Sequence, residues 1–160
     1  MSYVNSVLGT AEMIKYEADV SLLAFLPRFI FGGLLVLVGL FTFTISINEK
    51  VWDISAENIL GCALLLWGLY AMAVPIIEKE TTELVITNRR IIAKFGLISR
   101  YTIEINLQKI ESISVSQSIF GRILNYGDLQ IIGTGGTIEP IPNIGDPLMF
   151  RRKFDETLNN

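Results

Sequence analysis

Two long apolar runs without charged residues dominate the hydrophobic pattern of the chain. They cover residues 29–47 and 59–77 and are separated by a short polar link. Each run of about 19 residues would extend about 28 Å as a helix, close to the thickness of the hydrocarbon core of a bilayer. Neither run has the polar stripe of a helix on the surface of a soluble domain. The pattern predicts a transmembrane helical hairpin, and the alternative is a buried hairpin in a soluble protein.

Residues 1–28 form an approach segment ahead of the hairpin. Residues 13–19 alternate partly between polar and apolar side chains and predict a short strand, which would either join the edge of the C-terminal domain or lie at the membrane interface. Pro27 suits the first turn of the first span. A secretory signal peptide would lead from a basic segment straight into an apolar one, so we expect this N-terminus to stay on the mature protein.

After residue 77 the pattern changes to short alternating runs that predict β-strands. The clearest alternation sets Tyr101, Ile103 and Ile105 against polar neighbours. Similar runs bring the expected number of strands after the hairpin to about six. They are followed by a helical period that begins near Asp146 and Pro147. We therefore expect an antiparallel bent sheet or open barrel with one C-terminal helix over its end.

The C-terminal helix is predicted by the spacing of its apolar residues. Phe150, Phe154 and Leu158 fall on one helical face, which we expect to pack against the sheet.

Basic residues are distributed unevenly around the hairpin. The link contains Lys50 alone, whereas the outer flanks contain Lys15, Arg28, Lys79, Arg89, Arg90 and Lys94. Because Lys and Arg content sets the orientation of membrane proteins, we expect a multi-pass protein with both termini in the cytoplasm and the link outside.

Four glycines recur at helical spacing in the two apolar runs. Gly32 and Gly39 are separated by two helical turns, and so are Gly61 and Gly68. Small residues on one face let helix backbones approach closely. The pattern indicates either a packed seam, within the hairpin or between protomers, or simply the frequency of glycine in membrane helices. Since the runs contain no Asp, Glu, Lys, Arg or His and only one cysteine, Cys62, we expect an anchor and not a transport pathway.

Composition argues against several classes of function. The mean hydropathy is +0.48 and 51% of the residues are hydrophobic, which favours a membrane protein. The formal net charge of −3 argues against nucleic-acid binding. The chain has no histidine and one cysteine, so it offers neither a Cys/His metal cluster nor the commonest general base. We expect no cofactor, no metal site and no enzymatic activity.

Five consecutive pieces of the C-terminal half resemble the bacterial PH-like domain family, the second bacterial pleckstrin-homology group. They are residues 82–92 (TELVITNRRII), 94–100 (KFGLISR), 105–111 (INLQKIE), 121–128 (GRILNYGD) and the closing helix.

The resemblance covers roughly residues 80–158 and implies a strongly bent β-barrel of about seven strands capped by a C-terminal helix. The approach segment is then a candidate for the seventh strand. Family members commonly carry one or two transmembrane helices ahead of this domain. The expected organisation is an approach segment (1–28), a hairpin (29–77) and a PH-like domain (78–160) in a bacterial plasma (inner) membrane protein.

The resemblance also implies a candidate site, because eukaryotic PH domains hold phosphoinositide headgroups with clustered Lys and Arg. The residues that would bind headgroups or a partner are Arg89, Arg90, Lys94, Arg100 and Arg122. Residues 78–160 contain as many acidic as basic residues, however. The alternative is that Arg89 belongs to a solvated turn and Arg90 is a charge on a strand face.

The sequence thus predicts a non-enzymatic, membrane-anchored PH-like module that mediates protein–protein or self-association at the cytoplasmic face. An open barrel would leave unpaired backbone groups to which a partner strand can add. Two alternatives stay open: a sensor or binder of anionic lipid headgroups, and an accessory subunit of a membrane transport or envelope-stress complex.

Overall fold

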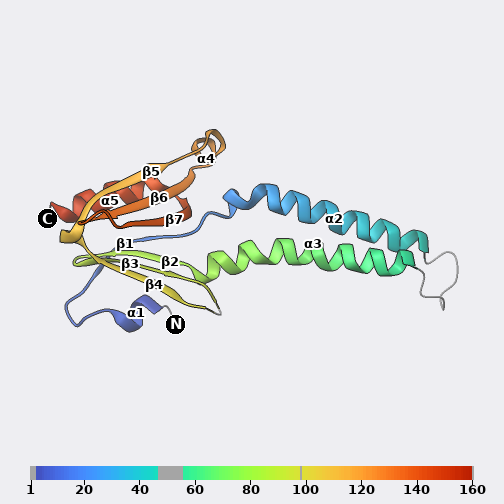
Figure 1. Cartoon of the computed structure of the whole chain (residues 1–160), viewed down its shortest axis with the longest axis horizontal. Helices are drawn as coiled ribbons and strands as arrows, with labels where there is room; N and C mark the ends of the chain where they lie inside the picture. Colours follow the sequence, from blue (N-terminus) through green and yellow to red (C-terminus); the bar gives the residue numbers. More distant parts are fainter. Residues whose placement is uncertain (1–2, 47–55, 98, 160) are drawn as a thin grey trace. The chain divides into compact units, whose positions relative to one another are not determined.

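The computed structural model describes residues 3–46, 56–97 and 99–159, and these form two compact units (Figure 1). The helical unit is Phe25–Ile77. The second unit, here called the β unit, combines Met1–Ala24 with Glu78–Asn160. The two units are described separately.

The helical unit contains α2 (Leu26–Ser46) and most of α3 (Ala56–Thr81). Pro27 lies in the first turn of α2, where its missing N–H has no helical partner to lose. Both helices are long and apolar enough to cross a membrane, with a mean hydropathy of 2.1 in each span. Only 11% and 22% of the two spans are buried, whereas a core helix of a soluble protein would be mostly buried. The expected polar link, including Lys50, lies almost entirely outside the described residues.

The four glycines lie in pairs between α2 and α3. A Cβ atom added to Gly32 would lie 2.9 Å from the carbonyl oxygen of Gly68, and one added to Gly39 would lie 2.9 Å from that of Gly61. Gly33, in contrast, has no atom within 4 Å of its added Cβ apart from its chain neighbours and the backbone of its own helix. The two backbones therefore approach each other where a larger residue would not fit.

The β unit contains two antiparallel sheets. The first has the order β1-β2-β3-β4, with β1 (Ile14–Ala18), β2 (Glu83–Thr87), β3 (Arg90–Phe95) and β4 (Tyr101–Asn106). The second has the order β5-β6-β7, with β5 (Ile110–Ser116), β6 (Tyr126–Gly133) and β7 (Ile138–Gly145). The approach segment supplies β1, whose Ala18 lies opposite Leu84 of β2.

The expected barrel is not closed. On one side, the N–H of Gly145 donates to the carbonyl of Asp19 at 2.9 Å, and that of Ser21 donates to Asn143 at 2.8 Å. These bonds join the end of β1 to β7. On the other side, β4 and β5 are edge strands of different sheets. The short 3₁₀ turn η2 (Leu107–Lys109) redirects the chain between them. Among the described residues, strand pairing joins the two sheets only between the end of β1 and β7.

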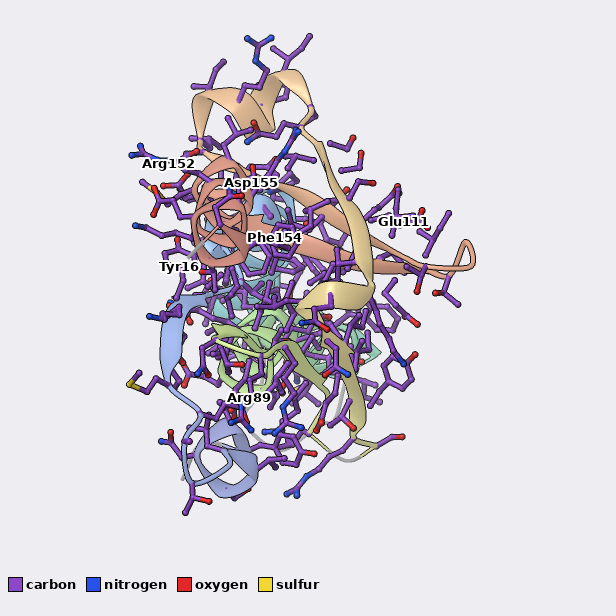
Figure 2. All side chains as sticks on the ribbon, turned by 90° about the vertical axis from the view of Figure 1, so that its left-hand side faces the viewer. Tyr16, Arg89, Glu111, Arg152, Phe154 and Asp155 are labelled. Atoms are coloured by element: carbon purple, nitrogen blue, oxygen red, sulfur yellow. The ribbon has the colours of Figure 1, made fainter. Side chains whose placement is uncertain are left out.

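The C-terminal helix, α5 (Pro147–Leu158), contacts strands of both sheets. Asp146 caps it by accepting a hydrogen bond from the N–H of Met149 at 3.3 Å. Phe150 is fully buried and its ring lies 6.1 Å from that of Tyr16 in β1. Figure 2 shows Phe154 on the side of α5 that faces the sheets. The predicted apolar face is therefore buried, except that Leu158 at its end remains half-exposed.

A short N-terminal helix, α1 (Tyr3–Val7), was not expected from the sequence. Its Val4 is fully buried in a small apolar cluster with Val85 of β2 and Ile92 of β3. α1 therefore covers the face of the first sheet that carries these two side chains.

Candidate functional site

Arg90, at the start of β3, is bonded to carboxylates from two other segments. Its Nη2 and Nε donate to the two oxygens of Glu12 at 2.8 and 3.0 Å. Its Nη1 donates to Glu104 of β4 at 2.6 Å. The hydroxyl of Thr87 also donates to Glu12, at 2.7 Å. These bonds, with the paired Arg90 guanidinium as the main cause, lower the pKa of Glu12 to about 2.

Lys94, near the end of β3, is similarly engaged. Its Nζ donates to Glu83 at 3.0 Å and lies 5.9 Å from the centroid of the Tyr3 ring. The carboxylate of Glu83 also accepts the N–H groups of Tyr3 and Val4 at 3.1 Å, so it satisfies the first donors of α1. Arg90 and Lys94 thus hold the N-terminal segment against the first sheet, Arg90 through its ion pair with Glu12 and Lys94 through its contact with Tyr3.

The five basic residues predicted as a site do not form one cluster. Arg89 lies in the β2–β3 turn and Arg100 just before β4, and the register of β3 with β4 places these two at opposite ends of the first sheet. Arg122 is exposed on α4 (Ile119–Ile123), in the connection between β5 and β6. Binding of a headgroup by all five residues together stays a prediction of the resemblance.

A groove of about 470 Å³ lies where the β2–β3 turn meets η2 and the end of α5. Its lining residues are Asn88, Arg89, Asn106, Leu107, Gln108, Lys109, Thr157 and Leu158. They include two basic side chains and, within the described part of the chain, no acidic one. Figure 2 faces the side of the β unit that carries Arg89. In a domain with balanced charges, such a groove concentrates positive potential and suits a carboxylate or phosphate group.

The backbone frame of this groove is fixed by hydrogen bonds. The N–H of Leu107 donates to the carbonyl of Arg89 at 2.9 Å, which joins the β2–β3 turn to η2. The side chain of Asn88 accepts from the N–H of Met13 at 3.1 Å and donates to the carbonyl of Ala11 at 3.3 Å. Arg89 was predicted as a binding residue, whereas Lys109 was missed because it comes beside Arg89 only through this fold.

The groove lies at the opposite end of the first sheet from the chain connections to the apolar helices. β2 begins with Glu83, just after α3 ends at Thr81, and runs toward the β2–β3 turn at the groove. β1 runs the other way, ends at Ala18 opposite Leu84, and continues toward α2. Both connections therefore leave the β unit at the end remote from Arg89.

The side chains that line this groove can donate and accept hydrogen bonds. Its lining offers guanidinium, ammonium, amide and hydroxyl groups. Among the described residues, no three His, Cys, Asp or Glu side chains gather as metal ligands.

A family model described as "Bacterial PH domain" matches residues 21–156. The match includes α2 and α3, so it extends farther toward the N-terminus than the resemblance over residues 80–158. No match was found among curated proteins or among solved structures.

Proposed function

The chain belongs to the bacterial PH domain family, and we propose that it is a non-enzymatic, membrane-anchored module that binds another protein. In this proposal α2 and α3 cross the bacterial plasma membrane as a hairpin, and both termini and the β unit lie in the cytoplasm. The hydropathy and low burial of the two spans support the crossing. The excess of Lys and Arg on the outer flanks supports the orientation.

The groove with Arg89 and Lys109 is the observation that carries this proposal. It lies at the end of the sheet remote from both connections to the anchor, so a partner in the cytoplasm can reach it. The two cations favour an anionic group. The side chains of Asn106 and Gln108 can pair with a peptide backbone, and Leu158 offers an apolar contact. This combination fits an acidic peptide segment, from another protein or from a second copy.

The neighbouring sheet edges extend the same surface. Asn106 ends β4 and Ile110 begins β5, and both strands are edges of their sheets. An extended peptide in the groove would be able to continue along one edge by strand addition.

Photo-crosslinking in native membranes tests the proposal. A photoreactive amino acid replaces Gln108 in the full chain, and the matched control carries it at Gln130, an exposed glutamine of β6. We expect a protein adduct at position 108 alone, lost in the Arg89→Ala/Lys109→Ala variant and retained in Arg151→Ala, which removes an exposed charge from α5.

The molecule that is crosslinked to position 108 distinguishes the alternative functions. Adducts to a second copy indicate self-association, and adducts to a transporter or envelope-stress protein indicate an accessory subunit. Only lipid adducts at position 108, dependent on Arg89 and Lys109, would overturn protein binding and support an anionic headgroup as ligand.

A further inference from the structure

The short helix α4 presents three large apolar side chains to solvent. Ile119, Phe120 and Ile123 are 79%, 72% and 73% exposed. No other large hydrophobic side chain in the described part of the β unit is exposed to the same degree. A contiguous apolar group of this kind on a protein surface marks a contact with a partner or a membrane.

α4 is a fixed element and not a loose loop. Ser118 caps it by accepting the N–H of Gly121 at 3.0 Å. The amide of Gln117 donates to the carbonyl of Tyr126 at 2.9 Å, across the base of the β5–β6 connection. A Cβ atom added to Gly121 would lie 2.7 Å from the same carbonyl, so α4 packs closely on the start of β6. The fold therefore holds the three side chains outward.

Strand register places α4 at the end of the second sheet that the chain reaches directly after β1. Tyr126, which follows α4, pairs with Gly145 of β7. The N–H of Gly145 donates to Asp19, and Val20 forms a bridge with Ile144. The chain then enters α2 at Leu26.

The connection from α3 reaches this same end. It enters β2 at Glu83, and the following residue, Leu84, lies opposite Ala18 at the end of β1. In Figure 1 α4 and the β2–β3 turn lie at opposite ends of the β unit.

An exposed basic residue accompanies these apolar side chains. Arg122 lies within α4 itself. It forms no ion pair with another described residue. A basic side chain beside inserted apolar groups can remain at the level of lipid phosphates.

We propose that α4 is a membrane-surface contact. Ile119, Phe120 and Ile123 enter the boundary between headgroups and acyl chains, and Arg122 stays at the phosphates. The inference rests on the proposed membrane anchor but not on the groove. Thr82 alone connects α3 to β2, and residues 19–25 connect β1 to α2. These short connections keep the β unit near the proposed anchor, so the bilayer is present at a higher effective concentration than any free partner.

Fluorescence of the full chain in lipid nanodiscs tests this contact. In a Cys62→Ser background, Phe120→Cys is labelled with an environment-sensitive dye. Ile138→Cys, an exposed site of β7 at the other end of the second sheet, is the matched control. We expect the label at 120 to shift its emission to the blue and to be quenched by lipids with a nitroxide at a shallow acyl position. The label at 138 should show neither effect.

Two further measurements distinguish a lipid contact from a contact with a second copy and from loss of the anchor. The blue shift should persist at one copy per nanodisc; a shift seen only with several copies would mean that a second copy covers α4. A label at Leu66, an exposed site within the apolar span of α3, reports the anchor. Lipid quenching at 66 without quenching at 120 would overturn the α4 contact alone, and no quenching at 66 would overturn the membrane anchor as well.

A separate measurement tests the proposed position of Arg122, the basic residue of α4, at the lipid phosphates. Replacing Arg122 with Ala should reduce quenching at 120 more in anionic than in neutral lipid, because the guanidinium is placed at the phosphates. An equal reduction in both lipids would overturn that placement of Arg122.

Discussion

Glu12 shows how much one charged side chain contributes to the assembly of the β unit. Its side chain is only 3% exposed and is held by Arg90 and Thr87, which follow it by more than 70 residues. A carboxylate removed from water in this way is stable only while its charge-assisted hydrogen bonds persist. The pair therefore fixes the segment that leads into β1.

We predict that Glu12→Gln loosens the N-terminal segment. The neutral amide cannot reproduce the ion pair, and the loss of a hydrogen bond to a charged group costs about 2 kcal/mol. Hydrogen–deuterium exchange of the full chain in detergent should show faster exchange in residues 3–18. Glu17→Gln, at an exposed position of β1, is the control and should leave exchange unchanged. Equal exchange in both variants would show that the Glu12–Arg90 pair stabilises nothing.

The same pair predicts a defined response to acid. The pKa of Glu12 is about 2 in the folded chain against 4.5 for a free carboxyl group. Because the folded-state pKa is the lower one, the stabilisation is complete above about pH 4.5 and is lost as the pH falls toward 2. Protection factors of residues 3–18, corrected for intrinsic exchange, should fall over this interval. In Glu12→Gln the fall should be smaller, and an identical fall in both proteins would contradict the assignment.

At the residue scale, the sequence identified basic side chains but not their partners. Alternation placed Arg90 and Lys94 on a strand, but the carboxylate of Glu12 that holds Arg90 comes from a segment with no visible relation to it. No sequence pattern indicated Lys109 as a binding residue, because it lies near Arg89 only when η2 folds against the β2–β3 turn.

At the scale of elements, local pattern and tertiary context contribute differently. The partial alternation of residues 13–19 was enough to predict a strand where β1 (Ile14–Ala18) lies. α1 was missed, because five residues without a helical period are too short to be stable alone. Its stability comes from Val85, Ile92 and the Glu83 carboxylate, none of which is local in sequence.

The glycine pairs make a prediction about the helical unit. Gly39→Leu should push α2 and α3 apart, because its Cβ would lie 2.8 Å from Leu65 Cγ and 2.9 Å from the Gly61 carbonyl. Gly33→Leu is the matched control, since its Cβ meets no atom within 4 Å. Spin labels at positions 37 and 66 in a Cys62→Ser background should give a longer or broader distance distribution in Gly39→Leu only. Unchanged distances would show that the seam tolerates a side chain.

At the scale of the whole molecule, the β unit combines two sequence segments, one before and one after the helical unit. β1 precedes the apolar helices and β2 follows them, yet they are neighbours in one sheet. The family resemblance began near residue 80 and implied about seven strands, of which about six were visible after the hairpin. The missing strand was predicted as a strand, and joining the edge of the C-terminal domain was one of two alternatives for it. Its partner strand, β2, was not predicted, because pairing across the intervening helices leaves no local pattern.

This arrangement predicts that residues 78–160 do not fold alone. Without residues 3–18, the fragment lacks β1, leaves the fully buried Leu84 and Ile86 of β2 at a bare sheet edge, and separates Arg90 from Glu12. An unprotected apolar edge strand promotes aggregation. A protein in which residues 1–24 are joined through a flexible Gly/Ser linker to residues 78–160 restores β1 and α1 without the apolar helices. We expect dispersed amide resonances and a monomeric elution volume from the joined protein, and aggregation or collapsed spectra from 78–160. A well-dispersed spectrum from 78–160 would show that β1 is an accessory to a domain that is already complete.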